Sequence, residues 1–257
     1  PPQPQIETRV SGAEQVYQPA LPIGQARPLA TLPVIDGKLD AAWDQAFQIS
    51  DLVGQDGSTN KHRTEAWIGR DAANLYVAFK CWEDEMESLQ ATVKDHDGPV
   101  WSDDSVEVFL DPDSDQQTYL HLVVNSLGTR RDSRHAFRSA DPAAQRRESA
   151  DKVEDATWNP RWQAAAAPCP EGWCVEMAIP LSELGPSSSV WGVNLNRTRR
   201  VPAGVEYGCW SPTFRGFNVP GRFGKLLMNA SALTPVAAQQ SPAAWGDNRL
   251  LLTLENP

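Results

Sequence analysis

The segment Trp101-Ser-Asp-Asp-Ser-Val-Glu-Val-Phe-Leu-Asp111 decides most of what the sequence predicts about the fold. From Ser105 onward its residues alternate between two faces, as they do along a half-buried β-strand. The dry face consists of Val106, Val108 and Leu110. Continued backward, the alternation places Trp101 and Asp103 on the same face as Glu107. A flat ring beside carboxylates suits a sugar-binding surface, because the ring stacks on a pyranose and the carboxylates accept hydrogen bonds from its hydroxyl groups.

A second alternating segment, Tyr119-Leu-His-Leu-Val-Val-Asn125, follows the polar connection Pro112–Gln117 and predicts a β-hairpin. If the hairpin is symmetric about this connection, Phe109 lies opposite Tyr119, Glu107 lies near His121, and Asp103 lies near Asn125. The polar face of the hairpin is therefore the predicted ligand-binding surface. Its residues are Trp101, Asp103, Glu107, His121 and Asn125.

Seven segments of the chain occur in the order seen in family 9 carbohydrate-binding modules and their DOMON-like relatives. They are Asp36–Asp40 with Trp43, Asn74–Ala78, Trp101–Asp111, Asn125–Gly128, Gly172–Pro180, Trp191–Arg197 and Phe223–Leu226. The resemblance extends from about Pro33 to Met228. It implies a β-sandwich in which two tryptophans clamp the end of a glycan.

Within this resemblance, Trp101 matches the first clamping tryptophan, and Trp210 is the best candidate for the second. Glu107 and Asn125 match positions that hydrogen-bond sugar hydroxyls. The best-known sugar binder of the family has an arginine two residues before the asparagine, where this chain has Val123. This difference bears on which sugar the site accepts.

Short alternating segments separated by turn residues predict an all-β fold, a two-sheet β-sandwich or jelly roll of antiparallel strands. We expect strands at residues 64–69, 75–82, 105–110, 118–125, 130–137, 162–167, 173–179, 191–197, 207–210 and 223–228, and helical turns at 41–46 and 181–184. Most of the ten tryptophans are expected in the core, namely Trp43, Trp67, Trp158, Trp162, Trp173 and Trp191.

The predicted domain is residues 29–230. Residues 1–28 form a Pro-rich N-terminal arm, and residues 231–257 form a C-terminal extension that could add an edge strand through Leu250–Leu254. The polar segment Asp141–Asn159 is expected to be a long loop.

The chain carries 33 acidic and 23 basic residues, a formal net charge of −10. This charge argues against nonspecific binding of nucleic acid or anionic membranes. No apolar stretch is long enough to span a bilayer, and the sequence does not open with Met or with a positively charged, apolar signal segment. A processed secreted protein or a shortened chain would begin in this way, and we expect a secreted, extracellular or periplasmic protein.

The four cysteines predict two disulfides. Cys169-Pro-Glu-Gly-Trp-Cys174 is too widely spaced for a CxxC motif, and its centre reads as the turn of a hairpin that the two cysteines would cross-link. Cys81 and Cys209, both in predicted strands, would form the complementary bridge. The alternative is four reduced core thiols in a cytosolic protein.

Acidic residues surround the predicted site, at Glu83–Glu85, Asp95–Asp97 and Asp103–Asp104. Oxygen ligands suit calcium, and the family resemblance implies structural calcium in some members, although the pattern does not assign the ligands. The alternative is solvated charge. The arginines of Arg130–Arg138 could pair with uronic acids or balance these acids.

The predicted function is non-catalytic binding of an oligo- or polysaccharide, beside an attached or associated carbohydrate-active enzyme. The alternative is a glycoside-cleaving enzyme that uses Glu107 with His121 or Asp103, although residues i and i+4 of one strand stand roughly 13 Å apart. A third possibility is a haem-binding electron-transfer domain of the same sandwich type. Met86, Met177 and Met228, with the histidines, could supply its axial ligands.

Overall fold

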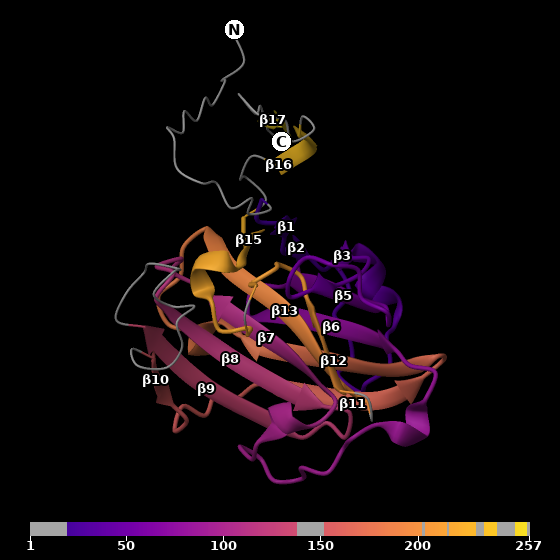
Figure 1. Cartoon of the computed structure of the whole chain (residues 1–257). Coiled ribbons are helices and arrows are strands. Elements are labelled where there is room, and N and C mark those ends of the chain that lie inside the picture. Colours follow the sequence, from indigo (N-terminus) through magenta and orange to yellow (C-terminus); the bar gives the residue numbers. More distant parts are fainter. Residues whose placement is uncertain are drawn as a thin grey trace, which may run out of the picture. The chain divides into compact units, whose positions relative to one another are not determined.

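The computed structural model describes residues 20–137, 152–201, 204–214, 216–229, 234–240 and 250–255. The chain divides into two compact units. The larger, Leu21–Met228, is a sandwich of two β-sheets (Figure 1). The smaller comprises Pro1–Ala20 and Asn229–Pro257; in its described residues, β16 (Thr234–Gln240) pairs antiparallel with β17 (Leu250–Glu255).

The first sheet of the sandwich has nine strands in the described residues, and its main path runs β1-β15-β13-β7-β8-β9-β10. Strand β14 pairs with β13 and with the short β4. The bounds are β1 (Ile23–Gln25), β4 (Val53–Gly54), β7 (Ser105–Asp111), β8 (Thr118–Asn125), β9 (Arg130–Phe137), β10 (Lys152–Asp155), β13 (Val190–Val201), β14 (Gly204–Cys209) and β15 (Gly224–Leu227).

The second sheet has the order β11-β12-β6-β5-β2, with β3 also paired to β5. Its strands are β2 (Arg27–Pro28), β3 (Phe47–Ile49), β5 (Thr64–Arg70), β6 (Asn74–Trp82), β11 (Gln163–Cys169) and β12 (Gly172–Pro180). Short 3-10 helices connect the strands: η1 (Ala41–Gln45), η2 (Met86–Ser88), η3 (Val100–Ser102), η4 (Leu181–Glu183) and η5 (Pro220–Arg222). The pairs β1–β15 and β2–β5 are parallel, and the other described pairs of the sandwich are antiparallel.

These elements confirm the predicted β-sandwich, and each predicted strand and helical turn has a counterpart. Three boundaries differ. Strands β1 and β2 lie within the stretch predicted to be an arm, because their backbones pair with β15 and β5. The C-terminal strand β17 pairs antiparallel with β16 in the smaller unit. Residues 152–155 of the predicted loop form β10, which pairs with β9, whereas residues 141–151 lie outside the described residues.

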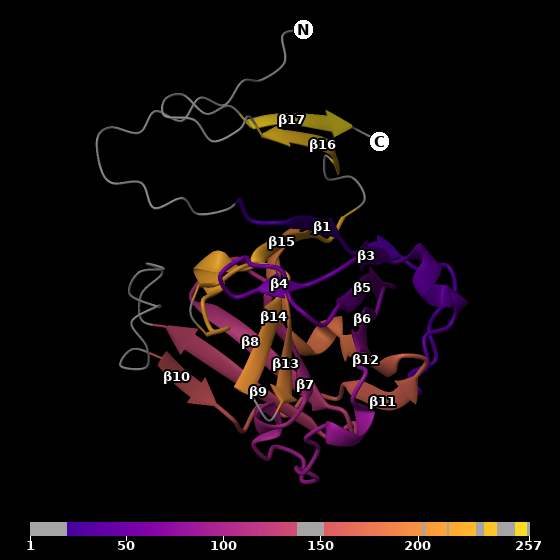
Figure 2. The same cartoon turned by 45° about the vertical axis from the view of Figure 1, so that its right-hand side comes forward.

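The sandwich is seen from a second direction in Figure 2. Its main apolar core lies between the two sheets and follows the strand alternation. Strand β7 contributes Val106, Val108 and Leu110, whereas Phe109 points to the opposite face of the nine-stranded sheet. There it joins a second cluster with Tyr119, Phe137, Cys209, Phe217 and Phe223. The nine-stranded sheet is therefore covered by apolar groups on both faces.

The outer face of the six-stranded sheet is covered by the segment that precedes β3. Glu176 of β12 holds this segment: its carboxylate accepts hydrogen bonds from the backbone N–H groups of Asp36 (3.1 Å) and Gly37 (2.9 Å) and from Nε1 of Trp43 (2.7 Å). Gly37 has a φ of 83°, and a Cβ there would lie 2.7 Å from the backbone nitrogen of Ala167. The Asp-Gly turn therefore needs its glycine for both conformation and space.

The β7–β8 hairpin has its side chains on the predicted faces, but the predicted register was wrong by two residues. Phe109 pairs with His121 rather than with Tyr119. The connection between the strands is asymmetric, with Ser114 and Gln116 in the left-handed region at φ 60° and 61°. A shift of two residues preserves the faces, because side chains repeat every second residue.

The first predicted disulfide is present: Cys169 and Cys174 are bonded across the β11–β12 hairpin. The predicted Cys81–Cys209 bridge was wrong, and both residues are buried free thiols. Cys81 lies in the core between the sheets, whereas Cys209 belongs to the cluster on the other face of the nine-stranded sheet. A sheet therefore separates the two sulfur atoms.

Candidate functional site

A cavity of about 440 Å³ lies on the outer face of the nine-stranded sheet. Strands β7, β8 and β9 form its floor, β13 and β14 flank it, and the segment that follows β14 adds a wall. Its lining is Gln55, Trp101, Glu107, His121, Arg131, His135, Lys152, Glu154, Thr198, Arg200, Tyr207, Gly216, Phe217 and Asn218. Three of the predicted site residues are thus brought together here, namely Trp101, Glu107 and His121.

Aromatic rings stand on two sides of the cavity. Trp101 on η3 is 41% exposed, and the guanidinium of Arg131 lies 4.5 Å from its ring centroid. The guanidinium covers part of the indole, and the exposed remainder of the ring is accessible to a ligand. Tyr207 on β14 is 40% exposed and meets Phe217 edge-on at 5.6 Å. A flat apolar ligand surface could therefore contact aromatic rings from two directions.

Glu107 and His121 form the polar floor of the cavity. Nε2 of His121 lies 2.7 Å from Oε2 of Glu107, and Oγ1 of Thr198 donates to Oε1 at 3.2 Å. Glu107 is buried, and the His121 ring stacks on Phe109 with centroids 4.2 Å apart. Each carboxylate oxygen keeps a lone pair beyond these bonds, so Glu107 can accept further hydrogen bonds from a ligand.

His135 on β9 is a cavity residue that the sequence did not single out. Burial, followed by the nearby His121, Lys152 and Arg131, lowers the pKa of His135 to about 2, so the ring is neutral at physiological pH. Its Nε2 lies 2.8 Å from Oγ of Ser133, and its Nδ1 is buried without a hydrogen-bond partner among the described residues. A ligand hydroxyl could satisfy this nitrogen.

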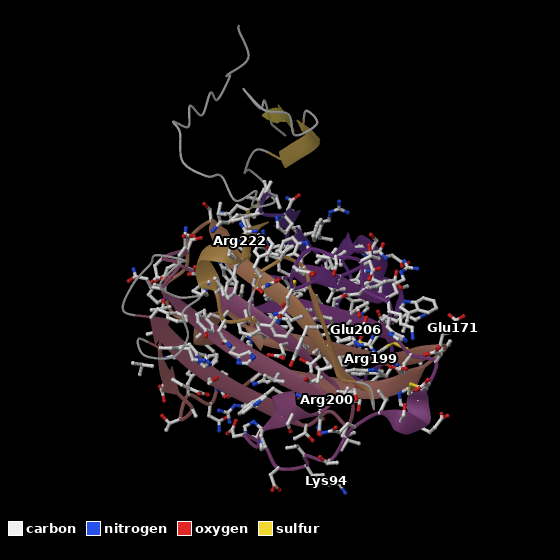
Figure 3. All side chains as sticks on the ribbon, in the orientation of Figure 1. Lys94, Glu171, Arg199, Arg200, Glu206 and Arg222 are labelled. Carbon is white, nitrogen blue, oxygen red and sulfur yellow. A yellow bond between two sulfur atoms is a disulfide. The ribbon has the colours of Figure 1, made fainter. Side chains whose placement is uncertain are left out.

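Charged residues form the rim. Arg131 donates from Nη1 to the carbonyl of Asp97 (2.6 Å) and from Nη2 to Glu154 (2.6 Å), which fixes its guanidinium against the Trp101 ring. Arg200 donates from Nη2 to the carbonyl of Trp101 at 3.0 Å. Figure 3 labels Arg200 beside Arg199; as neighbours on β13 they point to opposite faces of the sheet.

Asp103 and Asn125, also predicted to bind the ligand, do not line the cavity. Both are fully buried, and the Asp103 carboxylate accepts hydrogen bonds from the backbone of Thr92 and Val93 and from Nδ2 of Asn125 (2.9 Å). Oδ1 of Asn125 accepts from the backbone N–H of Thr129 and of residue 127. The alternation does not continue before Ser105, because residues 100–102 form η3 and redirect the chain.

Trp210, predicted as the second clamping tryptophan, also lies elsewhere. It packs edge-on against Phe47 at 6.2 Å and above Gly24 and Gly224, on the side of the main core. Tyr207, three residues earlier, faces the cavity instead. The signal was available in the sequence, because alternation along β14 puts Tyr207 and Cys209 on one face and Trp210 off it.

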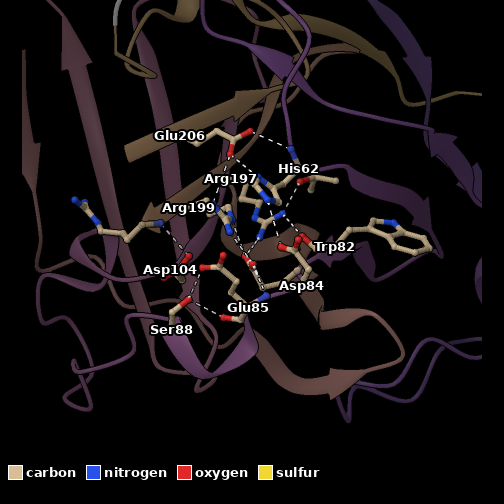
Figure 4. A network of polar contacts seen from close by, with 12 residues as sticks. His62, Trp82, Asp84, Glu85, Ser88, Asp104, Arg197, Arg199 and Glu206 are labelled. Atoms are coloured by element: carbon tan, nitrogen blue, oxygen red, sulfur yellow. Dashed lines mark hydrogen bonds and ion pairs between the residues drawn. The ribbon is translucent and has the colours of Figure 1, made fainter. Parts of the chain in front are cut away.

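The acids Glu83 and Asp104 have structural roles (Figure 4). Glu83 accepts hydrogen bonds from Nε (2.6 Å) and Nη2 (2.7 Å) of Arg199 and from Nη2 of Arg197 (3.2 Å). Burial raises the pKa of Glu83, but the hydrogen bonds and charges of these arginines outweigh burial and lower the pKa to about 2. Asp104 accepts from the backbone N–H groups of Gln90 and Arg200. This polar network joins β6 to β13 at one end of the sandwich.

Three groups of side chains in the described residues could hold a metal ion: His62–Glu83–Asp84, His96–Asp97–Asp132 and Asp111–Asp113–Asp115. The third offers only carboxylates, which calcium prefers. Burial, with Asp113 and Asp115 nearby, raises the pKa of Asp111 to about 7. Calcium binding stays a prediction.

The methionines considered as haem ligands lie away from the cavity, and haem binding stays a prediction. Met177 and Met228 are buried in the main core, and Met86 packs against that core. No methionine is among the residues that line the cavity in the described part of the chain. Across the same residues, no helix is long and apolar enough to cross a membrane.

Comparison with known proteins gives a family match over most of the sandwich. Residues 35–228 match the family model described as carbohydrate family 9 binding domain-like. Two curated relatives are endo-1,4-beta-xylanase A of Thermotoga neapolitana, 26% identical over 201 residues, and that of Thermoanaerobacterium saccharolyticum, 26% identical over 203 residues. Each match covers 76% of this chain but only 17% and 15% of the respective xylanase.

Solved structures share the fold at low sequence identity. Two of them are of a family 9 carbohydrate-binding module of Caldicellulosiruptor kristjanssonii. The complex with glucose has a TM-score of 0.55 and 18% identity, and the match covers 80% of this chain and 94% of that chain. The complex with cellotriose has a TM-score of 0.56 and 19% identity, and the match covers 84% of this chain and 99% of that chain. A third is a putative carbohydrate-binding protein of Bacteroides uniformis (0.63, 17%, 82% and 100%). These similarities support the β-sandwich assignment.

Proposed function

The chain belongs to the carbohydrate family 9 binding domain-like family, and from this premise we propose that it binds a carbohydrate in the cavity on the outer face of the nine-stranded sheet. The ligand is an oligo- or polysaccharide, bound without being cleaved. Relatives of the same fold that were solved with glucose and cellotriose support this class of ligand.

The observation that carries the proposal is an exposed tryptophan beside a buried carboxylate in one cavity. Trp101 is partly exposed at the cavity, and Glu107, in the same lining, can accept further hydrogen bonds. Pyranose rings combine an apolar C–H face with hydroxyl donors, so the pairing fits one sugar ring. The volume of about 440 Å³ lies within the range typical of small-ligand sites.

In the bound state, Trp101 would stack on the sugar, with Tyr207 and Phe217 on the opposite wall. Glu107 would accept hydroxyl hydrogen bonds, oriented by His121. We propose that the end of the chain is the part bound, because walls on several sides would accommodate a terminal unit better than the middle of a long polymer.

We propose binding rather than cleavage because of the acids that line the cavity. Glycoside cleavage needs two carboxyl groups at a defined separation. Asp103, the predicted partner of Glu107, is fully buried and saturated by hydrogen bonds outside the cavity. Glu154, the other acid of the lining, is already paired with Arg131.

The match to a small part of two xylanases supports a role beside a carbohydrate-active enzyme, attached or associated. We extend the proposal to a secreted location, where such substrates and a Cys169–Cys174 disulfide would both be found.

Isothermal titration calorimetry with cellotriose and xylotriose tests the proposal. We expect one binding site, and we expect weaker binding of the borohydride-reduced trisaccharide if the reducing end is the part recognised. Product analysis of the same mixtures after long incubation should find no cleavage. Absence of binding across a panel of neutral and acidic oligosaccharides would contradict the proposal, and cleaved product would replace it with a catalytic function.

A further inference from the structure

A group of potential metal ligands lies behind the cavity floor, outside the proposed sugar site. His96, Asp97 and Asp132 each offer one ligand atom, and these three atoms lie within 4.8 Å of one another. Nε2 of His96 is 3.5 Å from Oδ1 of Asp132, and Nδ1 of His96 is 3.0 Å from Oδ2 of Asp97. His96 and Asp97 come from the loop before η3, and Asp132 comes from β9.

Asp132 provides a second, independent observation. It is fully buried, and Trp162 donates from Nε1 to its Oδ1 at 2.9 Å. Its Oδ2 has no hydrogen-bond partner in the described part of the chain. A buried carboxylate with an unpaired oxygen is costly unless a cation compensates it.

The local backbone holds the three side chains together. Asp97 has a φ of 63°, and its backbone N–H donates to the carbonyl of Arg130 at 3.1 Å. The backbone N–H of Asp132 lies 3.4 Å from Oδ1 of Asp97. The loop is therefore fastened to β9 where the ligand atoms converge, and His96 and Asp97 are partly exposed.

We propose that His96, Asp97 and Asp132 form a binding site for a divalent transition-metal ion of the zinc class. The donor set is one imidazole nitrogen and two carboxylate oxygens, which Zn²⁺ binds at about 2.0–2.2 Å. Imidazole favours transition metals, whereas calcium takes about 6–8 oxygen ligands, more than this group offers. The indole N–H of Trp162 orients Asp132 from the outer shell.

The site would act on the structure by fastening the loop that carries Asp97. The carbonyl of Asp97 accepts from Arg131, which lies over the Trp101 ring. A metal ion would thus stabilise one wall of the cavity from behind. The proposal does not rest on carbohydrate binding, because it concerns different side chains on the other face of β9.

The competing explanation is a protonated His96 that bridges the two carboxylates with no metal. A calorimetric titration distinguishes these two explanations. The full chain is first stripped of metal with a chelator and is then titrated with ZnCl₂ at pH 7.5. We expect one Zn²⁺ to bind per chain. We also expect the NMR resonance of the Trp162 indole N–H, identified by its absence in Trp162→Phe, to shift when Zn²⁺ binds. A bridging imidazolium gives neither result, and that outcome would overturn the proposal.

Variants locate the ion. His96→Ala removes the nitrogen from a partly exposed position without leaving a core cavity, and Asp132→Asn keeps the acceptor for Trp162. Each should weaken Zn²⁺ binding at least tenfold, whereas Asp113→Asn, an exposed acid of another cluster, should change it less than twofold. Equal binding by His96→Ala and the wild type would refute the site. Displacement of Zn²⁺ by an equal concentration of Ca²⁺ would refute the metal class.

Discussion

Replacing Trp101 by alanine tests the stacking role on which the proposed function depends. Trp101 is 41% exposed, and a tryptophan offers up to about 250 Å² of contact area, so roughly 100 Å² is available to a ligand. At about 25 cal/mol per Å², complete coverage is worth about 2.5 kcal/mol, and coverage of one ring face about half of that. We therefore expect the Kd for a bound oligosaccharide to rise between about 10-fold and about 70-fold.

The same variant should leave the fold nearly intact. An exposed ring leaves no cavity when removed, and the lost contact with the Arg131 guanidinium is worth about 0.5–1 kcal/mol. For a domain of this size the melting temperature should fall by less than about 4 °C. Calorimetric titration gives the affinity, and differential scanning calorimetry gives the melting temperature.

Trp82→Ala is the matched control. Trp82 is also partly exposed and also lies under a cation, Lys80 Nζ at 3.8 Å from the ring centroid, but it does not line the cavity. Because Nε1 of Trp82 also donates to Glu65 (2.9 Å), Trp82→Ala should lose at least as much stability as Trp101→Ala, and it should lose no sugar affinity. The reasoning fails if Trp101→Ala binds sugar within twofold of the wild type, or if it melts many degrees lower, which would make Trp101 a core residue.

Three further predictions concern buried charge. Glu107→Gln should weaken sugar binding at least tenfold by calorimetry, because one of the two acceptor oxygens becomes an NH₂ donor and the negative charge is lost; unchanged affinity would exclude Glu107 from the site. Glu83→Gln should cost about 3–5 kcal/mol in urea unfolding at pH 7, because two buried arginines lose their counter-charge. The lowered pKa of Glu83 means that wild-type stability is lost as pH falls from about 4.5 to about 2, so the difference from the variant should shrink there. In the wild type, stability should decline below pH 6.5, because His135 binds a proton in the unfolded state but not in the folded state, where its pKa is about 2. His135→Asn should make this decline shallower; parallel profiles of unfolding free energy against pH would contradict this.

The strands and their faces were predictable from sequence because they depend on local alternation. Along β7 the period of two separated the residues between the sheets from those on the cavity side, and the structure confirms it for Val108 and Glu107. A register error of two residues left these faces intact. Alternation could not predict where a strand begins, and η3 turned Asp103 inward while keeping Trp101 at the cavity.

The rest of the site depends on contacts between residues far apart in sequence. Tyr207 and Phe217 reach the cavity only because β14 pairs with β13, which in turn pairs with β7. No local pattern encodes this order of strands. The two buried cysteines show the same limit: elimination paired them, but the sheet between Cys81 and Cys209 keeps them apart.

The four acids of the segment Trp101–Asp111 differ in the kind of group that donates hydrogen bonds to each carboxylate. Asp103, Asp104 and Asp111 all accept hydrogen bonds from backbone N–H groups, so their removal would release loops rather than a ligand. In the described residues, Glu107 instead forms its hydrogen bonds with two side chains on the cavity floor, His121 and Thr198. Backbone donors are fixed by the fold, whereas side-chain donors can share an acceptor with an incoming hydroxyl. Of four carboxylates that look alike in the sequence, this difference selects Glu107 as the one positioned to meet a ligand.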